Sequence, residues 1–133
     1  MKKIISLILL INITVFAEFK SISYKEVQEL EKTQAAVIVD IRTPPEWKET
    51  GVIPNSKKIM FFDAKGKYDL ISWYKEFTKY VPNKEHPFIL VCRTASRTNM
   101  LGKFLDQEGY KHVYHLKGGI IYGYKMMGFK TVE

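Results

Sequence analysis

The stretch PFILVCRTASR, residues 87–97, contains the only cysteine of the chain and indicates how the fold is built. Its apolar run, residues 88–91, is unbroken, which is typical of a strand buried on both faces of a parallel sheet. Cys92 stands at the carboxyl end of this run. Residues 93–97 then form a short loop that leads into a helix, which Gly109 can end in a left-handed cap.

Strand and helix signals alternate on both sides of this unit. Ser23 and Glu26 have the spacing of a capping box, which predicts a helix over residues 24–32, and the apolar run 36–39 predicts a second buried strand ending at Asp40. The other expected elements are a loop over 42–50 with a helical turn at 46–47, a turn over 51–55, a short strand over 58–62, a helix over 68–80, a strand over 112–116 and a helix between 118 and 128. This order predicts an α/β fold in which helical crossovers connect parallel strands.

Residues 1–17 have the pattern of a secretory signal peptide. Lys2 and Lys3 provide a cationic start, residues 4–16 are mainly Ile and Leu, and Ala17 is the small residue expected before a cleavage site. A membrane-spanning helix needs about 20 apolar residues, and this segment is shorter. We therefore expect a cleaved signal peptide over 1–17, a domain over 18–133, a periplasmic or secreted protein, and no membrane attachment after cleavage. An uncleaved anchor or a buried strand is the alternative.

Composition limits the classes of function. A chain of 133 residues with 46% hydrophobic and 26% charged residues corresponds to one globular domain, and a single cysteine cannot form an internal disulfide. The net charge of +7 comes from scattered lysines without a long basic run, so we expect no nucleic-acid partner. His112 and His115 are three residues apart on an expected strand and point to opposite faces, and His86 lies in another loop. We therefore expect no metal and no cofactor.

Cys92 is either a buried apolar filler or a reactive group. In an open α/β sheet, ligands bind at the carboxyl ends of the strands. The small residues after Cys92 allow backbone N–H groups to form an anion-binding cup beside the N-terminus of the next helix. This cup, with Arg93 and Arg97 nearby, favours the thiolate, which is the nucleophile. The reactive interpretation is therefore favoured.

Four segments, in this order, resemble the motifs of a single-domain rhodanese. They are residues 39–42 with 45–47 (VDIR and PEW), residues 51–56 (GVIPNS), residues 91–97 (VCRTASR) and residues 116–120 (LKGGI). The resemblance extends from about residue 24 to residue 128. It implies a rhodanese-like open parallel sheet with helices on both faces.

The same resemblance implies a sulfurtransferase. Cys92 would take a sulfane sulfur from a small anionic donor such as thiosulfate, and pass it from a persulfide to a thiol, a cyanide-like molecule or a protein. Substrate would bind at Arg93, Thr94, Ala95, Ser96 and Arg97. Phosphatase relatives have a loop one residue longer than 92–97, which favours sulfur transfer. The alternatives are a persulfide carrier or partner-binding module without turnover, and a phosphatase or arsenate reductase that uses the same thiolate.

Asp40 and Arg42 are expected to support the site. A carboxylate at the end of a buried strand needs a partner, so Asp40 binds loop N–H groups or an arginine, or else makes a local turn bond. Arg42 pairs with Glu46 or Asp40, and direct substrate contact is the less favoured alternative. Ala95 stands where the family commonly has glycine, so a left-handed backbone there would be strained.

Overall fold

The computed structural model describes residues 19–133, so the expected signal peptide over 1–17 lies outside the described residues. Within 19–133, no helix combines the length and the apolar character needed to span a membrane. The elements are β1 (Lys20–Ile22), α1 (Tyr24–Gln34), β2 (Val37–Asp40), α2 (Pro44–Thr50), β3 (Lys57–Lys58), α3 (Leu70–Tyr80), β4 (Phe88–Val91), α4 (Ser96–Gln107), β5 (Val113–Leu116) and η1, a π-helix (Ile121–Lys125).

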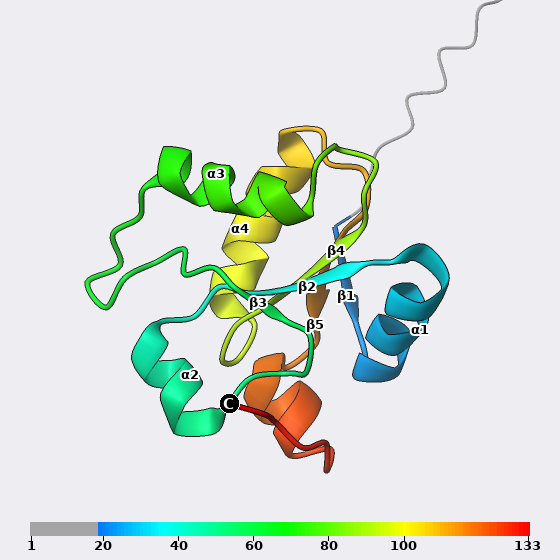
Figure 1. Ribbon diagram of the computed structural model, residues 1–133, viewed down its shortest axis with the longest axis vertical. Coiled ribbons are helices and arrows are strands. Elements are labelled where there is room, and N and C mark those ends of the chain that lie inside the picture. The colour runs from blue at the N-terminus through cyan, green and yellow to red at the C-terminus, as the bar shows by residue number, and fades with distance from the viewer. Residues whose placement is uncertain (1–18) are drawn as a thin grey trace, which may run out of the picture.

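The five strands form one parallel sheet with the order β1-β5-β4-β2-β3 (Figure 1). Strand β4 lies at its centre, and Leu90 has Val39 as its partner on one side and His115 on the other. Parallel neighbours need long crossover connections, which the helices provide. The expected α/β fold with an open parallel sheet is confirmed.

Helices cover both faces of the sheet, and the central strand contributes to a core on each side (Figure 1). Phe88 and Leu90 belong to a buried cluster with side chains of α3 and α4, whereas Ile89 and Val91 belong to a second cluster with side chains of α1 and η1. This alternation follows from the two-residue period of a strand. Cys92 continues it and belongs to the first cluster.

Local capping signals in the sequence agree with the helix ends. The Ser23 hydroxyl accepts a hydrogen bond from the Glu26 amide at 3.3 Å, and the Glu26 carboxylate accepts one from the Ser23 amide at 2.8 Å, which completes the capping box of α1. Gly109 follows the end of α4 with a φ of 96°, as expected for a left-handed cap. The strand over 88–91 has the predicted bounds.

Other predicted elements are corrected. Residues 44–50 form the helix α2 rather than a loop, because the fixed φ of Pro44 suits a first helical position and Thr43 caps the helix together with Glu46. The strand expected over 58–62 is only the two-residue β3. The edge strand β1 was not expected, since its three residues contain no apolar run. The last helix is shorter than predicted and has π-type hydrogen bonding.

Candidate active site

The loop after β4 joins the central strand to the N-terminus of α4. Ala95 precedes the helix and has φ 76° and ψ 2°, so the left-handed backbone expected there is present. A side chain with a Cβ in this conformation costs about 1–2 kcal/mol. The surrounding contacts therefore hold the loop in a shape that Ala95 by itself disfavours.

The Cys92 thiol is held at the first turn of α4. Its Sγ lies 3.5 Å from the amide nitrogen of Thr98, which donates to it, and 3.5 Å from the Thr98 hydroxyl. The Thr98 amide is one of the N–H groups that a helix start leaves without an intrahelical partner, so a positive helix end faces the sulfur. The positive helix end stabilises negative charge placed close to the sulfur.

Cys92 is more enclosed than the sequence suggested. Its exposed fraction is 1%, and it packs within the apolar cluster under α3 and α4. Arg93, Thr94 and Ser96, which the sequence predicted to bind substrate, are exposed on the loop, and Ala95 is partly buried. The thiol is thus a deep group beneath a polar loop rather than a group at the surface.

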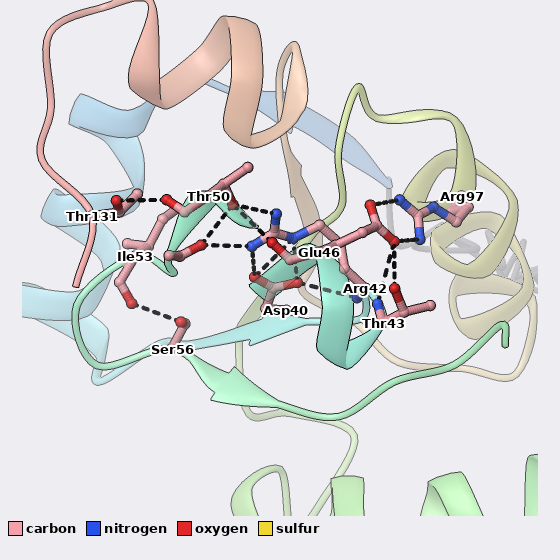
Figure 2. A network of polar contacts seen from close by, with 10 residues as sticks. Asp40, Arg42, Thr43, Glu46, Thr50, Ile53, Ser56, Arg97 and Thr131 are labelled. Carbon is pink, nitrogen blue, oxygen red and sulfur yellow. Dashed lines mark hydrogen bonds and ion pairs between the residues drawn. The ribbon is translucent and has the colours of Figure 1, made fainter. Parts of the chain in front are cut away.

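Arg97 connects the loop to α2 (Figure 2). Its two terminal guanidinium nitrogens each donate to one carboxylate oxygen of Glu46 at 2.7 Å. This bidentate bond is the main cause that lowers the pKa of Glu46 to about 2. The same bond raises the pKa of Arg97, with smaller contributions from the charges of Cys92 and Asp40.

Glu46 was missed as a site residue, although its motif was noted in the sequence. Its carboxylate also accepts from the amide of Thr43 at 3.3 Å and from the Thr43 hydroxyl at 3.1 Å, so one side chain caps α2 and positions Arg97. The sequence suggested Glu46 as a partner of Arg42, which is a local pairing. The actual partner is 51 residues away.

Asp40 and Arg42 form a buried ion pair beside this network (Figure 2). The Arg42 guanidinium donates to the Asp40 carboxylate at 2.8–3.1 Å, and the Arg42 amide donates to it at 3.1 Å. Arg42 also donates to the Thr50 hydroxyl at 2.7 Å and to the Gly51 carbonyl at 2.9 Å, and its exposed fraction is 0%. Arg42 therefore fixes the end of α2 and has no exposed surface to offer a substrate.

The segment after β5 supports the loop from behind. The Ile120 amide donates to the Cys92 carbonyl at 2.9 Å, and the Ile121 amide donates to the Arg93 carbonyl at 3.2 Å. Gly119 has a φ of 65°, and a Cβ there would lie 2.3 Å from the Arg93 carbonyl oxygen. The resemblance pointed to the segment 116–120, and the structure requires Gly119 in this segment for the close approach of two backbone segments.

The three histidines lie in separate environments. His86 Nε2 is 3.1 Å from the Ala35 carbonyl oxygen, and His112 is exposed next to β5. His115 is 6% exposed, its Nδ1 lies 2.8 Å from the Thr98 hydroxyl, and burial lowers its pKa. Among residues 19–133, no three His, Cys, Asp or Glu side chains gather where they could hold a metal ion.

Comparisons with known proteins point to one family. Residues 23–121 match the model of the Rhodanese-like domain. A tRNA uridine(34) hydroxylase of Chlamydia caviae is 30% identical over an alignment of 113 positions, which covers 77% of this chain but only 30% of the hydroxylase. The chain therefore spans about a third of the length of the hydroxylases that it matches.

Two solved structures share the fold. A rhodanese-related protein from Thermoplasma volcanium is 25% identical, with a TM-score of 0.62 over 86% of this chain and 98% of that one. A polysulfide-sulfur transferase from Wolinella succinogenes is 23% identical, with a TM-score of 0.65 over 88% of this chain and 80% of that one. The second similarity is evidence for the fold alone.

Proposed function

Since the chain belongs to the rhodanese-like domain family, we propose that it is a sulfurtransferase that carries sulfane sulfur as a persulfide on Cys92. One observation carries the proposal most directly. The Sγ of Cys92 accepts the Thr98 amide at the N-terminus of α4, next to a loop of six residues that ends in Arg97. The positive end of the α4 helix dipole faces this sulfur and stabilises negative charge close to it.

The reaction with thiosulfate has two displacement steps. The Cys92 thiolate attacks the outer sulfur, a new S–S bond forms to Cys92, and the S–S bond of thiosulfate breaks as sulfite leaves with its electron pair. A nucleophilic acceptor such as cyanide then attacks the outer sulfur of the persulfide and leaves as thiocyanate, which restores the thiolate. Each step moves one neutral sulfur atom, so the charge on the Cys92 side chain is the same before and after.

The loop residues have separate roles in this proposal. The exposed side chains of Arg93, Thr94 and Ser96 meet the anionic donor, and Arg93 contributes positive charge. Arg97, whose guanidinium is held by Glu46, sets the shape of the loop. Asp40 and Arg42 act at a distance, because they hold the end of α2.

The Chlamydia proteins are named for a hydroxylase activity, and this chain covers only about a third of their length. The Wolinella protein is named for transfer of polysulfide sulfur, but its 23% identity supports only a common fold, so the proposal rests on the rhodanese-like family match and on the position of Cys92. Among donors, we propose small anions such as thiosulfate or a polysulfide, because the thiol is 1% exposed beneath a cationic loop. Acceptors are a thiol, a cyanide-like molecule or a protein.

The leader-like residues 1–17 support a proposal about location. Their cationic start, apolar stretch and final Ala17 have the order of a signal peptide, so we propose that the domain acts in the periplasm or after secretion. Intact mass of the protein recovered from a host that secretes it gives the N-terminus. A chain that keeps residues 1–17 would contradict the proposal.

The test of function uses thiosulfate and intact-mass measurement. We expect the purified protein to gain the mass of one sulfur atom, and to lose it on addition of cyanide as thiocyanate appears. Cys92→Ser should show neither change while keeping the circular dichroism of the parent. A mass gain without thiocyanate would indicate a carrier rather than an enzyme. No mass gain with thiosulfate or polysulfide, or faster turnover of a phosphate ester or arsenate, would contradict sulfur transfer.

A further inference from the structure

A buried chain of hydrogen-bonding groups leads away from the Cys92 thiol. Sγ lies 3.5 Å from the Thr98 hydroxyl, and that hydroxyl lies 2.8 Å from Nδ1 of His115. The exposed fractions of the three residues are 1%, 0% and 6%. A titratable base is therefore separated from the nucleophile by one hydroxyl group, inside the core.

Three elements bring these groups together. In the register of the sheet, His115 of β5 lies opposite Leu90 of β4, two residues before Cys92. Side chains two residues apart in a strand share a face, so His115 lies on the face of Val113, which belongs to the cluster covered by α3 and α4. Thr98 lies in the first turn of α4, between the two strand ends.

The hydroxyl of Thr98 has one proton to donate, and three neighbours compete for it. The Ala95 carbonyl, 3.2 Å away, can only accept. While Cys92 is a thiol, its S–H can donate to Thr98, whose own proton then goes to Ala95 or to Nδ1 of His115. Once Cys92 is a thiolate it can only accept, so the Thr98 proton turns to sulfur and Nδ1 must donate. Ionisation of Cys92 thus reverses the chain and requires a proton on Nδ1.

We propose that His115 accepts, through Thr98, the proton that Cys92 loses, and so positions and stabilises the thiolate. The S–H bond breaks as a new O–H bond forms at Thr98, and the former O–H bond of Thr98 breaks as an N–H bond forms at Nδ1. The products are a thiolate and an imidazolium, with no change in net charge. The inference rests on the proposed function in one respect, that the Cys92 thiolate is the nucleophile.

The surroundings of His115 suit this role. Burial lowers the pKa of His115, so the ring is neutral while Cys92 is a thiol and takes up a proton only as the thiolate forms beside it. The ring of Phe19 lies against it, with centroids 4.6 Å apart. Of the ionisable groups around the Cys92 loop, Arg97 is paired with Glu46 and Asp40 with Arg42, and Arg93 is an exposed cation that cannot accept a proton. Among these described groups, His115 is the base that the hydrogen-bonded chain reaches.

The test measures thiolate directly by its ultraviolet absorbance as a function of pH, so no reagent has to reach the buried sulfur. Cys92 is the only cysteine of the chain, and Cys92→Ser supplies the blank for tyrosine absorbance. The comparison is between the midpoint of thiolate formation in the parent protein and the midpoint in its variants. His115→Asn keeps a polar group for Thr98 but cannot take a proton, and should raise the midpoint by about one pH unit or more, which is a tenfold loss of thiolate at any pH well below the midpoint.

Two further comparisons separate this role from a structural one. His112→Asn, at an exposed position three residues away, should leave the midpoint unchanged. Thr98→Val should raise the midpoint as His115→Asn does, whereas Thr98→Ser should leave it near the parent value, and His115→Gln is the second variant if His115→Asn does not fold. A midpoint that the His115 variants leave in place would overturn the relay, whatever Thr98→Val does, because the Thr98 hydroxyl also contacts the sulfur directly. Because no sulfur donor is involved, failure of the relay and failure of sulfur transfer are distinguishable.

Discussion

The Arg97 guanidinium binds both carboxylate oxygens of Glu46 at 2.7 Å, and this bond joins the first turn of α4 to the first turn of α2 (Figure 2). Both side chains are mostly buried, with exposed fractions of 25% and 19%. The same Glu46 caps α2 through Thr43. The shape of the Cys92 loop therefore depends on a helix that begins 48 residues earlier in the chain.

The stability of the protein should depend on Glu46 in acid. The folded pKa of Glu46 is lowered from 4.5 to about 2, so its contribution is present above 4.5 and is lost as the pH falls toward about 2. Glu46→Gln should lower the free energy of unfolding at neutral pH by about 1–2 kcal/mol, and this difference should shrink between those pH values. Urea denaturation of both proteins over this pH range measures it. A difference that is independent of pH would contradict the ionic role.

Gly119→Ala should destabilise the protein strongly. The new Cβ would lie 2.3 Å from the Arg93 carbonyl oxygen, and Gly119 also has a φ of 65°. Gly66→Ala is the matched control, because Gly66 has a φ of 76° but nothing within 4 Å of the added Cβ. We expect the control to lower the free energy of unfolding by about 1 kcal/mol, from backbone strain alone. Gly119→Ala should lower it by at least about 2 kcal/mol more. Equal losses in denaturant titrations would mean that the close approach is not needed.

Ala95→Gly should stabilise the protein, because glycine adopts the left-handed φ of 76° without the cost of a Cβ. The greater freedom of glycine in the unfolded chain offsets part of this gain, so we expect the free energy of unfolding to rise by about 0.5–1 kcal/mol. Ala35→Gly, at the left-handed end of α1 with a φ of 52°, should also stabilise the protein. Ala36→Gly should destabilise it, because Ala36 is buried and does not have a positive φ. Thermal unfolding midpoints measure all three. A lower midpoint for Ala95→Gly would show that the methyl group is required for packing.

Removal of one partner from the buried Asp40–Arg42 pair should lower the free energy of unfolding more than removal of both. Arg42→Met leaves the buried Asp40 carboxylate without a counter-charge, and we expect the free energy of unfolding to fall by about 3–5 kcal/mol. Addition of Asp40→Leu should recover a large part of this loss, because no uncompensated charge remains. Sulfur transfer in the folded double variant should persist, since Arg42 has no exposed surface. An inactive but stable double variant would assign the pair a direct part in the reaction.

The candidate site could be predicted in part from local sequence. The apolar run 88–91 placed Cys92 at the end of a buried strand, and the small residues after it placed the thiol at a helix N-terminus. The expected strain at Ala95 is present as well. Each of these features is determined by residues close together in the sequence, through side-chain periodicity, capping or the backbone preference of one residue.

The sequence by itself determined the alternation of strands and helices and the place of the one thiol, because periodicity and capping act over a few residues. The tertiary structure decided which distant side chains meet. Arg97 binds Glu46 across 51 residues, and Thr98 binds His115 across 17 residues, because strand order and register bring these segments together. Burial of Cys92 to 1% exposure has the same origin, since only the packing of α3 and α4 on the sheet encloses it. Contacts of this kind depend on where whole elements lie, which no short stretch of sequence specifies.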